Sequence, residues 1–460
     1  MNALLELSSW AANFPKGQNR LAAERAKSAF LDTIGVMSLG ASTPIAQNVA
    51  RMFESSGTGN CVLVGQPWRA PAPTAALINA VAAHACDFDD YEDPGATHPS
   101  AVLVPLLLAL GEDLASSGEA LLDAYVIGLE TAVQIGYGVN LSHYQLGWHA
   151  TATIGPLAAA AAAGRLLGLD QQKMAYAISL ATSSAAGYQT QFGTAAKPLH
   201  AGLAARSGIE AARLAQAGLN AALDSLDGPI SFLTLQSGKD SAGYSDLSKR
   251  LKDGLWIERV GLTVKMSPCC GYLLPALDAA LNLSKVEPLQ KDGLDRLEVQ
   301  LPAWQAKVVH YSHPRNANEA RFSLSYGIAT AFAKKKIEPT DFSDEAVKAA
   351  ESAKIMDMIE IKPLEAGPWD SEIGQTGPVR LTATSRSGEV FETFVEYHKG
   401  TPQNPVSQKE LQDKFRHCRS ILFEETGTSR LLDLLLNLEE LATIEPLTRE
   451  LTLNAPSPRN

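Results

Sequence analysis

The sequence predicts a mainly α protein with a large all-helical domain and a smaller α+β domain. Alanine-rich segments with helical spacing, such as Gly155–Asp170 and Leu199–Leu219, fill its first half. Alternating, strand-like segments follow, and helical spacing then returns near the C-terminus. We therefore expect residues 1–260, completed by helices in 400–460, to form the helical domain, and residues 261–399 to form the α+β domain.

The individual elements follow from the local patterns. The N-terminal stretch MNALLELSSWAANFPKG is typical of an amphipathic helix, and eight or more helices are expected before residue 255. The pair of strands around Ser387-Gly388 is predicted to form a hairpin. The other predicted strands are Ile257–Met266, Asp295–Trp304 and Met356–Leu364, and the later predicted helices are Leu273–Leu283, Phe322–Lys336 and Leu431–Ile444.

Composition excludes several classes of protein. The net charge of −11 includes no run of Lys or Arg, so neither nucleic acid nor an anionic membrane is an expected partner. The longest apolar run, Ala101–Leu110, is about half of the roughly 20 residues that span a bilayer. The N-terminus lacks the pattern of a signal peptide. Five cysteines without a CxxC pair favour a reducing compartment, and we expect a soluble, cytoplasmic protein.

The segment HACDFDDYEDPGATHPS, residues 84–100, concentrates acidic residues and histidines between apolar segments. It could be a metal site, an acid/base site or a solvated loop. No HxxxH or HExxH spacing for zinc occurs, and DFDDYEDPG departs from a calcium loop, so no metal is expected. Five of the nine histidines lie between residues 84 and 200, which points to this part of the chain: His84, His98, His143, His149 and His200.

Two lysines and a tyrosine have contexts that suit a site. Lys197 precedes a predicted helix, and Lys265 ends a predicted strand, where an ammonium could hold a carboxylate. A surface lysine explains each of them equally well. Tyr144 could be an acid or a packed aromatic side chain. The adjacent Cys269 and Cys270 are expected to be buried packing residues rather than nucleophiles.

Several ordered blocks resemble the MmgE/PrpD family over nearly the whole chain: HACDFDDYEDPGATHPSAVLVPLLLALGE, GWHATATIGPLAAAAAAGRLLGLD, KPLHAGLAARSGIEAARLAQAGL, VKMSPCCG and ARFSLSYGIATAF. The resemblance implies a helical domain plus an α+β domain, a homodimer, an active site between the domains, and no metal or organic cofactor. By motif match it places functional positions at Asp87, Tyr91, His98, His149, Lys197 and Lys265.

Family members include 2-methylcitrate dehydratases, cis-aconitate decarboxylases and iminodisuccinate epimerases. Tyr91 stands at the position where the decarboxylases of the family carry a Thr. The segment HPSAVLVP resembles the decarboxylase and epimerase branch rather than the dehydratases. All three reactions build negative charge on carbon next to a carboxylate of a small polycarboxylate substrate. Positive side chains must stabilise that charge.

The function that we expect from the sequence is a cofactor-independent epimerase of the iminodisuccinate type. A lyase, either decarboxylase or dehydratase, is the alternative, and a non-catalytic binding protein is a remote third. Asp89, Asp90, Glu92 and Asp93 are expected to be caps and solvated turn residues. The expected catalytic residues are His98, His149, Tyr144, Lys197 and Lys265, and the expected substrate-binding residues are Asp87, Tyr91 and His143.

Overall fold

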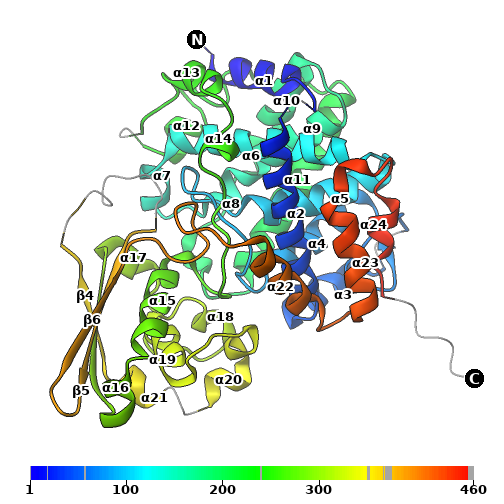
Figure 1. The fold of residues 1–460 in the computed structure, drawn as a ribbon. Coiled ribbons are helices and arrows are strands. Elements are labelled where there is room, and N and C mark those ends of the chain that lie inside the picture. The colour runs from blue at the N-terminus through cyan, green and yellow to red at the C-terminus, as the bar shows by residue number, and fades with distance from the viewer. Residues whose placement is uncertain are drawn as a thin grey trace, which may run out of the picture.

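The computed structural model describes residues 2–17, 19–55, 58–238, 241–349, 353–365, 367 and 376–453. It divides into a large helical part and a smaller part built on a sheet (Figure 1). The prediction of a mainly α fold with a smaller mixed region is therefore confirmed.

The helical part begins with long helices joined by short connections. The first helix forms where the amphipathic N-terminal pattern predicts it, capped by the Asn2 side chain. Its elements are α1 (Ala3–Asn13), α2 (Arg20–Ala41), α3 (Pro44–Phe53), β1 (Cys61–Val62), β2 (Arg69–Ala70), α4 (Ala72–His84), α5 (Pro99–Asp113), α6 (Gly118–Val139), α7 (Ser142–Gln145), α8 (Ala150–Thr153), α9 (Gly155–Leu166), α10 (Gln171–Ala181), η1 (Thr182–Ser184), η2 (Gln189–Gln191), α11 (Ala196–Gln216), α12 (Phe232–Gln236), α13 (Leu247–Lys252) and α14 (Trp256–Arg259).

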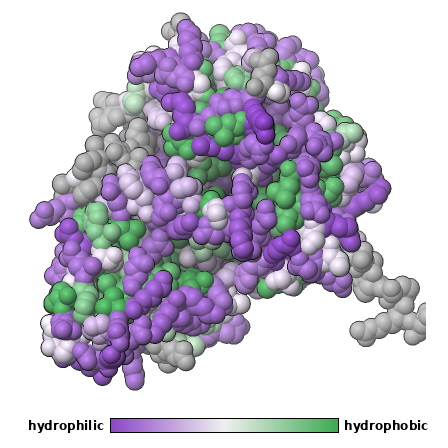
Figure 2. Space-filling view, in the orientation of Figure 1, coloured by the Kyte–Doolittle hydropathy of each residue, from purple (hydrophilic) through white to green (hydrophobic). Residues whose placement is uncertain are grey.

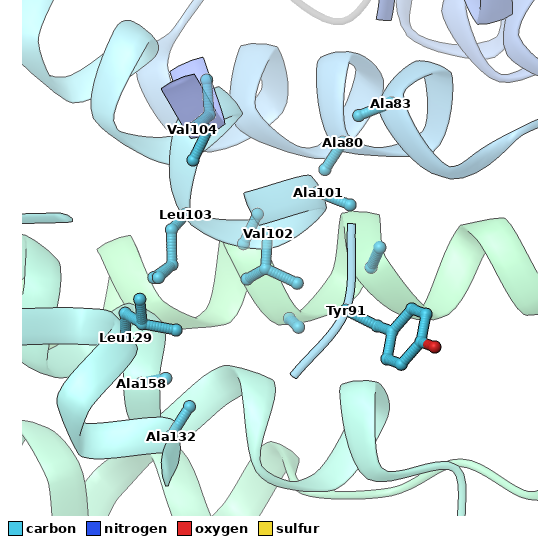
Figure 3. Packing of buried hydrophobic residues seen from close by; sticks show 14 of the residues in the cluster. Ala80, Ala83, Tyr91, Ala101, Val102, Leu103, Val104, Leu129, Ala132 and Ala158 are labelled. Carbon is cyan, nitrogen blue, oxygen red and sulfur yellow. The ribbon is translucent and has the colours of Figure 1, made fainter. Parts of the chain in front are cut away.

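Helix α5 lies at the centre of this part. It is apolar on all sides, because α4, α6, α9 and α11 surround it. Figure 3 shows Val102 and Leu103 of α5 among alanines of the neighbouring helices, with Tyr91 at the edge of the cluster. Small side chains let the helix axes approach closely, which explains the alanine-rich composition.

Gly208 lies at a close approach of α11 to α9. A Cβ built there would lie 2.2 Å from the Cβ of Ala159. We expect Gly208→Ala to lower the free energy of unfolding by about 1–3 kcal/mol, because this clash outweighs the roughly 1 kcal/mol gain in helix propensity. Urea denaturation would measure the change. Ser207→Ala, on the same helix, is the control, and equal stability of the two variants would contradict the prediction.

The smaller part contains a four-stranded mixed sheet in the order β4-β3-β5-β6, with only β3 and β4 parallel. Helix α15 packs on β5, β6 and α19. The elements are η3 (Gly271–Leu273), α15 (Leu274–Leu283), α16 (Glu287–Asp292), β3 (Leu294–Leu301), α17 (Ala303–Val308), α18 (Ala317–Ala320), α19 (Leu324–Lys334), η4 (Pro339–Phe342), α20 (Asp344–Lys348), α21 (Ala353–Met356), β4 (Ile359–Pro363), β5 (Val379–Ser385) and β6 (Val390–Val395).

Four of the five strands predicted in this region are confirmed as β3, β4, β5 and β6, and the strand predicted at Ile257–Met266 is wrong. Its first residues form α14, and Gly261 then turns the chain with a φ of 96°. The remainder is extended and alternates in burial, which produced the strand-like pattern. Its hydrogen bonds go to single residues in two loops, Tyr91 on one side and Gly400 on the other, rather than to a strand.

The chain returns to the helical part at its end through α22 (Gln408–Arg419), α23 (Glu425–Leu436), η6 (Leu438–Glu440) and α24 (Glu445–Arg449). Helix α22 packs against α2, and the buried Lys414 ammonium lies 2.6 Å from the Asp32 carboxylate of α2. In Figure 1 these orange and red helices lie beside the blue α2 and near α5. The helix predicted at Leu431–Ile444 corresponds to the second half of α23, which begins earlier, at Glu425, and ends earlier, at Leu436.

The surface in Figure 2 is largely hydrophilic, with smaller apolar areas between the charged residues. Among the described residues, no single helix combines the length and the apolar composition needed to cross a membrane. Only α2 and α3 taken together meet those criteria, and they are bent by 82° where they join.

Candidate active site

The acidic stretch forms a buried loop between α4 and α5. The expectation that its acids are solvated is wrong for Asp89, Asp90 and Glu92, whose exposed fractions are 0%, 1% and 1%. Each of these carboxyl groups faces donors that the loop itself or the start of α5 supplies. Ser100 donates its hydroxyl to Asp90, and Glu92 accepts from the Gly95 backbone N–H and the Thr97 hydroxyl. Internal donors thus replace water around these acids.

Glu92 makes this loop sensitive to pH. Burial raises the pKa of its carboxyl from 4.5 to about 7, although three loop donors oppose the shift. The folded state therefore binds the proton more tightly than the unfolded state does, and this contribution to stability is lost as the pH rises from 4.5 through 7. We expect Glu92→Gln to gain stability relative to the wild type by about 3 kcal/mol between pH 4.5 and 8. Urea denaturation at both pH values tests this, and a constant difference would contradict it.

Asp87 lies at the centre of the site, where three segments meet. Lys265, from the extended segment after α14, donates to the Asp87 carboxylate at 2.5 Å and to its backbone carbonyl at 3.0 Å. Lys197, from the first turn of α11, places its Nζ 3.0 Å from the same carboxylate oxygen. All three side chains are buried, and the structure brings these three residues, which the resemblance singled out, into contact.

The charges of this cluster follow from its geometry. Burial by itself raises the pKa of Asp87, but Lys197 and Lys265 outweigh it and hold that pKa well below 3.8. Burial likewise lowers the pKa of Lys265, and Asp87 and Asp89 reverse the effect, so Lys265 stays an ammonium. For Lys197 burial prevails over Asp87, and its pKa is lowered. Lys197 is thus the lysine that gives up a proton more easily.

His98 is held by the acidic loop and approaches the same Asp87 carboxylate oxygen as the two lysines. Its Nδ1 donates to the Asp90 carbonyl at 3.1 Å and lies 3.0 Å from an Asp89 carboxylate oxygen, while its Nε2 lies 3.9 Å from Asp87. The Asp89 carboxylate also accepts from His84 Nδ1 at 2.9 Å. Two acceptors at Nδ1 keep the proton there and leave Nε2 as the reacting nitrogen. Burial lowers the His98 pKa to about 3, with Asp89 opposing.

A pocket opens above this cluster, between the helical part and the sheet-containing part. Lys197 lies over the rings of Phe192 and Phe322, at 5.6 and 5.4 Å from their centroids. The Tyr91 hydroxyl is 2.9 Å from both His398 Nε2 and the Thr376 hydroxyl, so it joins the two parts. The pocket is lined by Tyr91, Ala96, His98, Tyr144, His149, Phe192, Lys197, Cys270, Gly271, Tyr272, Phe322 and Thr376.

The structure brings most of the predicted site residues to this pocket. His98, His149, Tyr144, Lys197 and Tyr91 line it, and Asp87 and Lys265 lie directly behind them. His143 is the exception. Its Nδ1 contacts the Gln236 carbonyl and its Nε2 contacts the Thr153 hydroxyl, so both ring nitrogens are engaged away from the pocket.

Several pocket and supporting residues were not predicted. Asp89 was missed because its loop was expected to be solvated, and His84, the last residue of α4, because no matched functional position fell on it. Tyr272 and Phe322 were missed because no local pattern separates a pocket aromatic from a core one. Among the residues singled out in the sequence, the Cys269-Cys270 pair came nearest to indicating this part of the pocket, because Cys270 lines it. Both cysteines are buried, as predicted, and burial raises the pKa of the Cys270 thiol to about 11, so it is protonated at neutral pH.

Four potential metal ligands meet in this cluster although no sequence spacing indicated them. Ligand atoms of His84, Asp87, Asp89 and His98 all lie within 4.8 Å of one another. A divalent cation there would face two lysine nitrogens that already contact Asp87, and this positive charge disfavours it. The donor set therefore fits a metal poorly, and the absence of a cofactor stays a prediction.

Acid/base side chains around a charged pocket, on a helical domain joined to an α+β domain, are the features of an enzyme. The chain belongs to the MmgE/PrpD family: residues 5–245 match its N-terminal domain and residues 267–440 its C-terminal domain.

Known relatives align over nearly the whole chain. The cis-aconitate decarboxylase of Mus musculus is 30% identical over 449 residues, which cover 94% of this chain and 89% of that protein. The cis-aconitate decarboxylase of Homo sapiens is 29% identical, with 95% and 91% covered. That of Aspergillus terreus is 25% identical, with 98% and 96% covered. These relatives are lyases, so they favour the lyase alternative over the epimerase that the sequence led us to expect.

Proposed function

We propose that this protein is a lyase that decarboxylates a small tricarboxylate of the cis-aconitate type. The observation that carries the proposal is the convergence of Lys197, His98 and His149 on one pocket, with Lys197 and Lys265 sharing the Asp87 carboxylate beneath it. Decarboxylation needs positive charge to hold the substrate and to stabilise the electrons left behind, and an acid to protonate carbon. The near full-length relatives support this choice over an epimerase.

The reaction begins with loss of carbon dioxide from the saturated carbon of the substrate. The electron pair of the broken bond forms a new double bond to the neighbouring carbon, and the original double bond shifts its electrons onto the next carbon. That carbon takes one proton, so each turnover releases one carbon dioxide and consumes one proton. Lys197 lines the pocket and Lys265 lies behind it, so both ammoniums oppose the developing negative charge.

Substrate binding allows a histidine of the pocket to become protonated and act as the acid. Burial lowers the pKa of His98 to about 3 and holds that of His149 well below 6.5, so both are neutral in the empty pocket. A tricarboxylate brings three negative charges close to these rings and raises both pKa values. His149 or His98 can then be protonated at Nε2 and transfer that proton to carbon. Asp89 stabilises the protonated form of His98.

The test is incubation with cis-aconitate in deuterium oxide, followed by carbon dioxide measurement and proton NMR. We expect carbon dioxide release and a product with a terminal methylene group and one deuterium per molecule. Deuterium in recovered substrate without carbon dioxide would instead indicate an epimerase. Absence of both would overturn the proposal.

We also propose a homodimer, which the family resemblance implies. Three apolar side chains in the helical part are well exposed, Leu146 at 62%, Ile230 at 81% and Leu235 at 68%. Apolar side chains of this kind are commonly buried in homodimer interfaces. Light scattering after gel filtration should give twice the 48.9 kDa of one chain.

A further inference from the structure

His200 stands next to the site without lining the pocket. Its Nδ1 lies 2.9 Å from Nδ1 of His149, and the ring centroids are 5.2 Å apart. His200 follows Lys197 by three residues on α11, so both side chains lie on the same side of that helix. It is the only partner that the described residues offer to His149 Nδ1. His149 lines the pocket, and its Nε2 is buried without a hydrogen-bond partner among those residues.

The ring of His200 is held in place by its surroundings. A Cβ at Gly187 would lie 3.1 Å from its Cε1 and 3.2 Å from its Nδ1, so the ring packs directly on this glycine. The Gly187 carbonyl in turn accepts from the backbone N–H of His149 at 3.0 Å. The same short segment therefore fixes the backbone of one histidine and the ring of the other.

Two facing Nδ1 atoms can share one proton only, so one ring donates and the other accepts. If His149 is to deliver a proton from Nε2, it is an imidazolium at that moment and carries a proton on both nitrogens. Its Nδ1 is then necessarily the donor and His200 the acceptor. After Nε2 has lost its proton, the same hydrogen bond persists. A bond donated by His200 would break each time His149 became protonated.

We propose that His200 is a positioning residue that accepts the Nδ1–H of His149 throughout the reaction, so that Nε2 of His149 is the nitrogen that exchanges protons with the substrate. This inference rests on the proposed function in that it assigns His149 a proton transfer. His200 replaces the carboxylate that orients many catalytic imidazoles, and it does so without adding a negative charge near an anionic substrate.

The test compares His200→Leu with His200→Asn. Leucine removes the acceptor, and the asparagine side-chain oxygen can take the place of Nδ1. We expect His200→Leu to lower kcat about 100-fold with KM changed less than about threefold, and His200→Asn to recover most of the loss. In a His149→Gln background, His200→Leu should cost nothing further, because its effect acts through His149. Equal losses in both variants, or a further loss in that background, would overturn the inference.

A second measurement does not depend on activity. Nitrogen-15 NMR of labelled histidines distinguishes the two neutral tautomers, and the His149 signals are those missing from His149→Gln. We expect the wild type to carry the His149 proton on Nδ1 and His200→Leu to lose that preference. A wild-type proton on Nε2 would overturn the inference even if decarboxylation is observed. The expected tautomer without turnover of cis-aconitate would instead overturn the proposed substrate alone.

Discussion

Replacing Lys265 with methionine is expected to lower kcat/KM for cis-aconitate by about 100- to 1,000-fold. The Lys265 side chain is fully buried and donates twice to Asp87, once to the carboxylate and once to the backbone carbonyl. Methionine keeps the volume but removes the positive charge, so the pocket binds the anionic substrate more weakly and stabilises its transition state less. Steady-state rates of carbon dioxide release would measure the loss.

Lys265→Met should also reduce stability, but only moderately. Leaving a buried charge unpaired costs about 3–5 kcal/mol, and Lys197 still contacts Asp87 in the variant, so the loss should fall below that range. Lys414→Met is the matched control, because it removes another buried lysine, whose ammonium contacts Asp32 and the backbone carbonyls of Phe88 and Lys265 but not Asp87. We expect the control to lose stability with a much smaller effect on kcat/KM. Comparable catalytic losses would indicate that Lys265 acts only through folding.

Asp89→Asn is expected to lower kcat by about 100- to 10,000-fold with little change in KM. Asp89 does not line the pocket, and its carboxylate lies between the Nδ1 atoms of His84 and His98. The amide oxygen of asparagine can still accept from both rings, but the amide carries no negative charge to stabilise protonated His98. The substrate contacts are unaffected, so the change should fall on kcat.

A double-mutant cycle with His98→Gln decides how Asp89 acts. If Asp89 works through His98, the double variant should be no slower than His98→Gln alone. Asp32→Asn is the control, since it removes a buried carboxylate of the same region that pairs with Lys414 instead. Fully additive losses, or an equal loss in kcat for the control, would show that Asp89 has a structural role only.

The positions of the helices could be predicted because their signals are local. Helix α15 and the hairpin of β5 and β6 lie where spacing and turn residues place them. The extended segment at Lys265 shows where this approach fails. Its alternation reflects real alternation in burial, but the partners that make a strand are far away in the sequence, and here they are two loops. Local periodicity therefore indicates which residues are buried. It does not indicate which segments form the hydrogen bonds of a sheet, because these depend on the tertiary structure.

The prediction that the acidic loop is solvated failed for a different physical reason. Carboxylates in a loop are solvated unless donors surround them, and the donors to Asp90 and Glu92 are hydroxyl and backbone N–H groups of the loop and the start of α5, which no spacing pattern reveals. The site itself joins residues far apart in the sequence, because Asp87 meets Lys197 and Lys265, more than 100 residues further along the chain. Only the resemblance indicated that these residues meet. It could not indicate Asp89 or His84, because no matched functional position fell on them, nor could it show that His143 is engaged elsewhere.

The pairing of Lys414 with Asp32 has a consequence for how this protein is made. Helix α2 leaves the ribosome early, but the helix that covers it, α22, is synthesised only after the whole sheet-containing part. Until then the Asp32 carboxylate lacks its ammonium, and an apolar face of α2 remains exposed. Domains generally fold in the order of synthesis. In this chain the helical part can be completed only after the sheet-containing part has been synthesised, because α22 follows that part in the sequence.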